Sequence, residues 1–143
     1  MAEHDDRAIR RASVAFVAGF VIHNIDHGRR GLEVITDHVV WGGTIVAMVA
    51  AVVLTLVATR HLLAPFAATA AGLSIAFGVT ASHLLPQWSA FSDPLPGGDV
   101  DALTWLAVAA EVAGALVLGL AGFQAVRRQG FLLPRQLRDA PAR

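Results

Sequence analysis

Four long apolar stretches are the feature that most constrains how this chain can fold. About 20 apolar residues in a helix are enough to cross a hydrocarbon core of about 30 Å. The stretches show no alternation of apolar and polar residues, so they predict helices and not membrane strands. We therefore expect an all-α fold, a four-helix transmembrane bundle that forms a single domain over residues 1–143. The predicted spans are 12–27, 38–59, 62–85 and 102–126.

The composition indicates an integral membrane protein. Hydrophobic residues make up 55% of the chain and charged residues 15%, whereas apolar residues make up about 45–50% of an ordinary soluble domain. A soluble fold of this size cannot hide so much apolar surface. We expect a multi-pass protein of the cell membrane, with the lipid bilayer around it. The chain has no cysteine, which excludes disulfides, thiolate metal sites, iron–sulfur clusters and covalently attached c-type haem.

The arginines predict the orientation of the chain in the membrane. Nine of the 11 basic residues lie before the first span, between the second and third, or after the fourth. The other two, Arg29 and Arg30, follow the first span. Because basic residues favour the cytoplasmic side, we expect both termini in the cytoplasm, with the tail 127–143 near anionic lipid and no nucleic-acid partner. The loops 28–37 and 86–101 then face outward.

Small residues recur every three or four positions on three of the predicted helices. Such faces let helix backbones approach closely in lipid, where packing drives helix association. The polar residues on these faces are therefore expected to point into the bundle. The faces are Gly19, His23 and His27 on the first helix, Gly72, Ala76, Thr80 and His83 on the third, and Ala107, Glu111, Gly114 and Ala115 on the fourth.

Six ionisable residues are predicted to lie at similar depth, in the outer half of the bundle. Their depth follows from a helical rise of about 1.5 Å per residue, counted from the outer end of each span. An ionisable group inside a bilayer costs at least a few kcal/mol, so it usually faces the interior and has a partner. The six residues are His23, Asp26, His27, His38, His83 and Glu111.

Metal coordination is the chemistry that suits this set. His23 and His27 stand four residues apart in the segment H-N-I-D-H, so they share one helical face, and other helices can supply further ligands. Imidazole and carboxylate favour zinc, iron or copper(II), and of these we expect zinc or iron. The lack of cysteine and the presence of only two methionines argue against copper(I). The predicted ligands are His23, His27, His83 and Glu111, with His38 and Asp26 as weaker candidates.

The outer loop 86–101 is too rich in proline and glycine to continue either neighbouring helix. Trp88 and Phe91 of the loop, with Trp41 and Trp105 at the same level, fit an aromatic belt at the outer interface of the membrane. In the other interpretation the loop covers a pocket that opens over the histidines, with Trp41 and Trp105 as apolar walls for a lipid-like or other small ligand. A metal ion with an open position would activate water or oxygen there, with Glu111 as ligand or general base. The residues leave open whether the chain is an enzyme.

Haem b is an alternative cofactor. A four-helix bundle can hold it between histidines on facing helices, here His23 or His27 with His83. Arg29 and Arg30 would then meet the propionates.

A non-catalytic membrane scaffold, or a subunit that binds another membrane protein, is the other alternative. Its buried polar residues would only join helices by hydrogen bonds. In that case His38, beside Asp37, is a solvated helix cap. Whichever function holds, we expect Asp26 to pair with Arg29 or Arg30.

Overall fold

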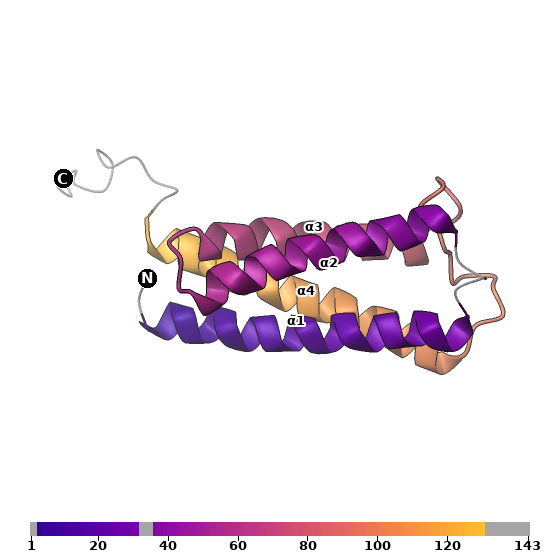
Figure 1. Ribbon diagram of the computed structural model, residues 1–143, viewed down its shortest axis with the longest axis horizontal. Helices are drawn as coiled ribbons and strands as arrows, with labels where there is room; N and C mark the ends of the chain where they lie inside the picture. Colours follow the sequence, from indigo (N-terminus) through magenta and orange to yellow (C-terminus); the bar gives the residue numbers. More distant parts are fainter. Residues whose placement is uncertain (1–2, 32–35, 131–143) are drawn as a thin grey trace, which may run out of the picture.

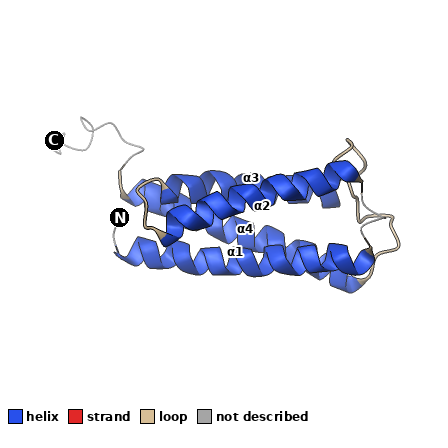
Figure 2. Cartoon of the chain, viewed as in Figure 1, coloured by secondary structure: helices blue, strands red, loops and turns tan. Residues whose placement is uncertain are grey.

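The described part of the chain folds into four helices that run alternately up and down one bundle (Figure 1). The computed structural model describes residues 3–31 and 36–130, and within them Figure 2 shows helices and loops and no strand. The all-α prediction is therefore confirmed, and each helix is long and apolar enough to cross a membrane. The helices are α1 (Glu3–Arg30), α2 (Asp37–Ala58), α3 (Ala64–Leu84) and α4 (Ala102–Arg128).

Local sequence explains where two of the helices begin. Thr36 precedes α2, and its side chain accepts a hydrogen bond from the backbone amide of Val39 at 3.3 Å. Asp101 does the same for α4, with the amide of Thr104 at 3.0 Å. These caps satisfy amides that have no partner inside the helix.

Two predicted connections differ from the structure. Residues 28–30 were expected in the outer loop 28–37, but they form the last turn of α1, which Arg29 and Arg30 suit because positive charge favours a helix C-terminus. Residues 32–35 of that loop lie outside the described residues. The predicted tail 127–143 begins inside α4, which ends at Arg128, and residues 131–143 are likewise outside the described part.

Helix α4 is the centre of the bundle, because α1 and α3 both pack along it. A methyl group on Gly114 of α4 would lie 2.8 Å from the carbonyl oxygen of Ala15 on α1, and one on Gly19 would overlap the backbone of Ala110. On the other side, a methyl group on Gly72 of α3 would overlap the backbone of Gly119 on α4 and lie 2.6 Å from the carbonyl oxygen of Ala115. The predicted small-residue faces therefore do bring the backbones together.

Helix α2 is the most loosely packed helix. It packs mainly against α3, touches α1 little, and buries only Ala50, Val53 and Val57. Its C-terminal end is held to α1 by Arg10, which donates to the carbonyl oxygen of Ala58 at 3.2 Å. Figure 1 shows that its N-terminal end lies farther from α1. This divergence leaves space between the two helices at the end of the bundle where α1 stops.

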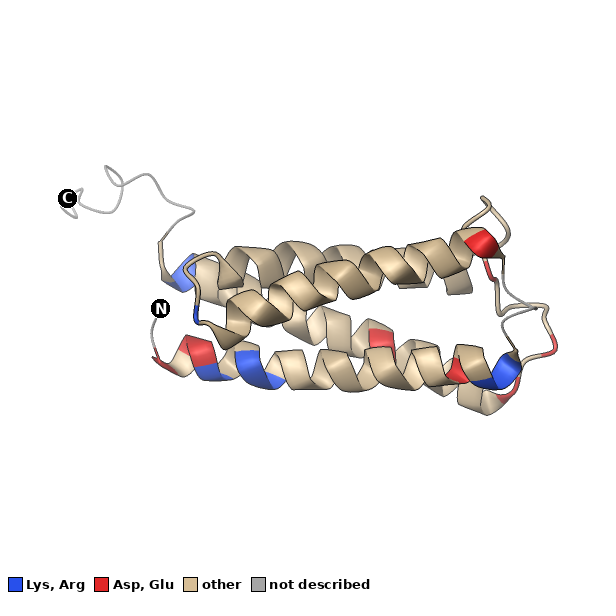
Figure 3. Ribbon diagram, viewed as in Figure 1, with Lys and Arg blue, Asp and Glu red and all other residues tan. Residues whose placement is uncertain are grey.

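Charged residues gather at the two ends of the bundle, and the described middle carries no lysine or arginine (Figure 3). At the end that holds the N-terminus, Asp5 pairs with Arg128 at 2.8 Å, and Asp6 pairs with Arg60 at 3.3 Å. Both carboxylates are buried. The arginines of this end are thus partly neutralised by buried acids, while a long apolar section separates them from the other end.

The contact between α1 and α4 leads to a prediction. Gly19→Ala should lower the free energy of unfolding by about 1–3 kcal/mol, because the added methyl group overlaps the α4 backbone and forces the helices apart. Gly78→Ala is the matched control, since a methyl group there meets no described neighbour within 4 Å; it should leave stability unchanged or raise it by up to about 1 kcal/mol. Chemical unfolding in detergent micelles measures both, and equal effects would contradict the packing.

Candidate metal centre

Three histidines from two helices meet in the interior of the bundle. The ring centroids are 4.5 Å apart for His23 and His27, 4.8 Å for His23 and His83, and 5.6 Å for His27 and His83. One nitrogen of each ring lies within 4.8 Å of the others, a grouping that could hold a metal ion. The predicted convergence of these three residues is therefore seen in the structure.

The helix packing explains why these rings meet. His23 and His27 are one turn apart on α1 and so share a face. Gly19, one turn before His23, lets that face lie directly against α4 beside Glu111. Because α3 packs on α4 as well, its last turn brings His83 to the same place. His23, His83 and Glu111 are 5%, 3% and 2% exposed, so water cannot solvate their polar atoms fully.

Glu111 contacts His23 directly. The Oε2 atom of the carboxylate is the hydrogen-bond partner of Nδ1 of the imidazole, and both side chains are buried. A carboxylate that accepts from Nδ1 leaves Nε2 of a neutral ring with its lone pair available. Histidines that ligate metals usually donate their other ring nitrogen to a carboxylate or a carbonyl in this way.

His83 is held in the same manner by the loop between α3 and α4. Its Nδ1 donates to the backbone carbonyl oxygen of Asp93 at 3.0 Å, which again leaves Nε2 as the available nitrogen. Asp93 is fixed in turn by Arg30 of α1, whose Nη1 lies 3.1 Å from Oδ2 of the carboxylate. No sequence pattern pointed to Asp93, because its hydrogen bond with His83 uses a backbone carbonyl in a loop.

His27 completes the group with an unpaired atom. Its Nδ1 is buried and has no hydrogen-bond partner among the described residues. A buried ring nitrogen without a partner costs roughly 1–3 kcal/mol, and a metal ion would remove that cost. Nitrogens around tetrahedral zinc lie about 3.3 Å apart, given Zn–N distances of about 2.0–2.1 Å. The observed separations, up to 4.8 Å, therefore require the rings to close in by about 1 Å or more.

The two weaker candidates lie away from this group. His38 is exposed, and its ring packs edge-on against Phe91 at 5.6 Å. Asp26 pairs with Arg29 through its Oδ1 at 2.8 Å, so the pairing expected for it is confirmed. Neither side chain stands with the three imidazoles.

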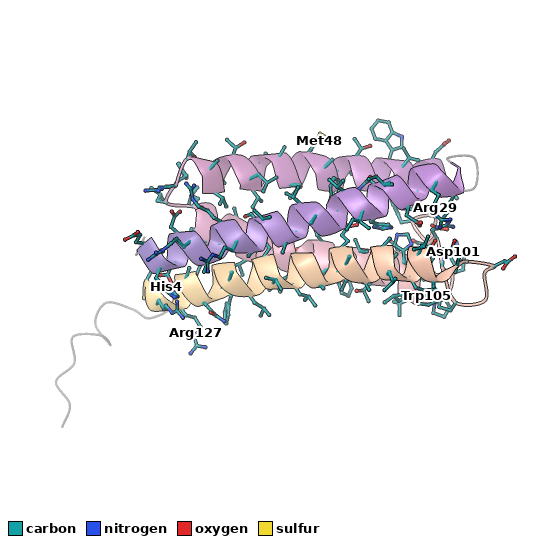
Figure 4. All side chains as sticks on the ribbon, turned by 90° about the horizontal axis from the view of Figure 1, so that it is seen from below. His4, Arg29, Met48, Asp101, Trp105 and Arg127 are labelled. Atoms are coloured by element: carbon teal, nitrogen blue, oxygen red, sulfur yellow. The ribbon has the colours of Figure 1, made fainter. Side chains whose placement is uncertain are left out.

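Arg29 also ties α1 to the start of α4. Its Nη1 lies 2.8 Å from Oδ2 of Asp101, and Figure 4 shows the two residues at the same end of the bundle, opposite His4 and Arg127. The hydrogen bond from the Thr104 amide lowers the pKa of Asp101 below its usual value, and Arg29 adds to this effect. Arg29 and Arg30 are thus both engaged by carboxylates, whereas the haem alternative needs them for propionates.

A cavity of about 400 Å³ lies beside the histidines, between α1, α2 and α3. His23, His27, His83 and Glu111 line it together with mainly apolar side chains. Trp88 and Phe91 of the predicted covering loop also line it, but Trp41 and Trp105 lie outside it and are exposed. The interpretation with tryptophan walls is therefore wrong: the walls are α2 and α3 residues such as Val46, Ile75 and Phe77.

Comparisons with protein-family models, with curated proteins and with solved structures gave no match to this chain. Function is therefore inferred from the side chains alone. Three imidazoles, two of them oriented by acceptors on Nδ1, stand beside an apolar cavity. This arrangement can bind a metal ion and leave one side of it open to a ligand.

Proposed function

We propose that the chain is a multi-pass membrane protein that binds one divalent transition metal ion, zinc or iron, through His23, His27 and His83. The observation that carries this proposal is the set of hydrogen-bond partners on the ring nitrogens of the three imidazoles. In His23 and His83 an acceptor occupies Nδ1, which leaves Nε2 of each ring free to bind the metal ion. In His27, Nδ1 is buried without a described partner. Hydrogen bonding alone explains the first two rings but not the third.

Glu111 orients a ligand in this proposal. Its carboxylate accepts from Nδ1 of His23, which fixes the ring and makes Nε2 more basic. It also brings one negative charge close to the cation in a site that is nearly closed to water. With three protein nitrogens, a tetrahedral ion keeps one open position, as in catalytic zinc sites, where a bound water or substrate oxygen would be polarised.

The crowding of the rings favours a single ion over haem b. The axial ligands of a haem iron lie on opposite faces of the porphyrin. His23 and His83 instead meet edge to face, with ring centroids 4.8 Å apart and planes at 74°. The third imidazole and a carboxylate stand in the same group, which a small cation would use and a porphyrin would not.

The surface of the bundle supports a place in a membrane. Large apolar side chains such as Val14, Phe77 and Leu106 are more than 60% exposed, which water would penalise and lipid would not. All four helices are long and apolar enough to span, and apart from Glu111 in α4 the charged groups of the described residues lie towards the two ends (Figure 3). We propose that both termini face the cytoplasm, because nine of 11 arginines favour that side.

Metal content tests the site. The purified wild type should hold about one zinc or iron ion per chain, and His27→Ala or His83→Ala should weaken metal affinity by more than tenfold, because each removes a ligand. His38→Ala and His61→Ala are matched controls on exposed imidazoles and should bind as the wild type does. Elemental analysis and titration with the metal measure this.

Glu111→Gln separates a metal centre from a scaffold. A carboxylate that orients a ligand contributes about 10–100-fold in affinity, so the variant should bind metal more weakly, and chelator should lower the melting temperature of the wild type more than that of the variant. If the polar residues only join helices, glutamine replaces glutamate with little effect and chelator shifts neither protein. That second outcome, or equal metal content in every variant, would contradict the proposal.

The orientation has its own test. The chain contains no cysteine, so single cysteines report their side of the membrane without background. Asp99→Cys, in the exposed part of the outer loop, should react with an impermeant thiol reagent in intact cells. Thr59→Cys, exposed between α2 and α3, should react only after the membrane is opened, and the reverse pattern would invert the proposed topology.

A further inference from the structure

The cavity beside the histidines extends along the helices. On α3 its lining runs from Ala71 to His83, and on α2 from Val39 to Val49. At about 1.5 Å per residue these stretches span about 18 Å and 15 Å. The volume of about 400 Å³ lies at the low end of the 300–1,000 Å³ of small-molecule sites. An extended cavity of this size suits one chain-like molecule.

The polarity of the lining changes along this length. The ionisable groups and the amide of Asn24 lie at the end formed by the last turns of α1 and α3. The opposite end is lined by side chains such as Val49, Ala71 and Ile75, with the hydroxyl of Ser74 as a polar exception. No arginine of the described residues lines the cavity. A ligand that matches this lining has one small polar head group, which does not depend on an arginine for binding, and one apolar chain.

The cavity opens through the long side of the bundle. Ile45 and Phe77 line it and are 53% and 75% exposed, whereas His23 and His83 at its polar end are nearly closed off. In a spanning bundle this opening faces the hydrocarbon. The polar end lies near the headgroups, because His83 is one residue from the end of α3. The lining of the cavity therefore changes from polar near the headgroups to apolar near the bilayer centre, as a lipid molecule in that half of the bilayer does.

We infer that a single-chain amphiphile from the bilayer binds in this cavity, with an oxygen of its head group on the open position of the metal and its chain along α2 and α3. The inference rests on the proposed function, since the head needs the ion that the histidines hold. Entry from the side agrees with the loose packing of α2 against α1. Trp88 and Phe91 of the outer loop line the cavity as well.

Trp88 offers a direct readout, because it lines the cavity while the other two tryptophans do not. The reporter protein is Trp41→Phe with Trp105→Phe, loaded with zinc in phosphatidylcholine nanodiscs and titrated with a brominated fatty acid, whose bromine quenches nearby indole fluorescence. We expect saturable quenching of Trp88. A second reporter that keeps only Trp105 measures partition into the bilayer and should show gradual quenching without saturation.

Gly78→Leu, made in the Trp88 reporter, tests the place of binding. Gly78 lines the cavity and a Cβ atom there meets no described neighbour within 4 Å, so a leucine side chain can start there without touching the backbone of another helix and occupy part of the cavity. We expect affinity for the brominated fatty acid to fall on the order of tenfold, with zinc content unchanged. Ala70→Leu, at an exposed position of α3 outside the cavity, is the matched control and should bind as the parent reporter does.

The outcomes separate this inference from the proposed function. Zinc bound normally without saturable quenching, or equal affinity in Gly78→Leu, would overturn the amphiphile site and leave the metal centre standing. Equal affinity for the brominated fatty acid before and after chelator would overturn the contact between its head group and the metal. Saturable quenching by brominated phosphatidylcholine would overturn the single-chain ligand. A wild type that holds no metal would remove the proposed function, and this inference with it.

Discussion

The close approach of α1 and α4 is the contact on which the rest of the structure depends. Gly19 has no side chain to keep the two backbones apart, so the next turn of α1 places His23 against Glu111 of α4. A carboxylate that is 2% exposed needs a partner, because an uncompensated buried charge costs several kcal/mol. The close backbone contact at Gly19 thus allows His23 and Glu111 to pair inside an apolar bundle. This pair fixes the orientation of the His23 ring, around which the site is built.

His83 is positioned by residues at the end of the bundle where α1 and α3 stop. In the loop between α3 and α4, the backbone carbonyl of Asp93 orients His83, and Arg30 of α1 holds the Asp93 side chain. Helix α2 is not drawn into this network, and its divergence from α1 leaves the cavity. The histidines are held rigidly on one side of the cavity, and α2 is held loosely on the other. This suits a site that keeps its metal-binding geometry and still admits a small molecule.

Much of this arrangement could be predicted from the sequence, because it follows from helical periodicity. Spacing placed His23 and His27 on one face, and counting residues from the helix ends put His83 and Glu111 at their depth. What failed depends on contacts between helices that periodicity does not encode. His38 packs against Phe91 of the loop, and Trp41 and Trp105 are exposed outside the cavity. Asp93 orients His83 through a backbone carbonyl, which no pattern of residue types predicts.

The central claim is that three imidazoles share one metal ion, and X-ray absorption at the zinc edge of the zinc-loaded protein tests it most directly. The account predicts three nitrogen neighbours at about 2.0–2.1 Å, with the outer-sphere scattering of imidazole rings, in both the wild type and Glu111→Gln, since Glu111 orients a ligand and does not bind the ion. A first sphere of oxygens without imidazole scattering, or one with a single histidine, would contradict it.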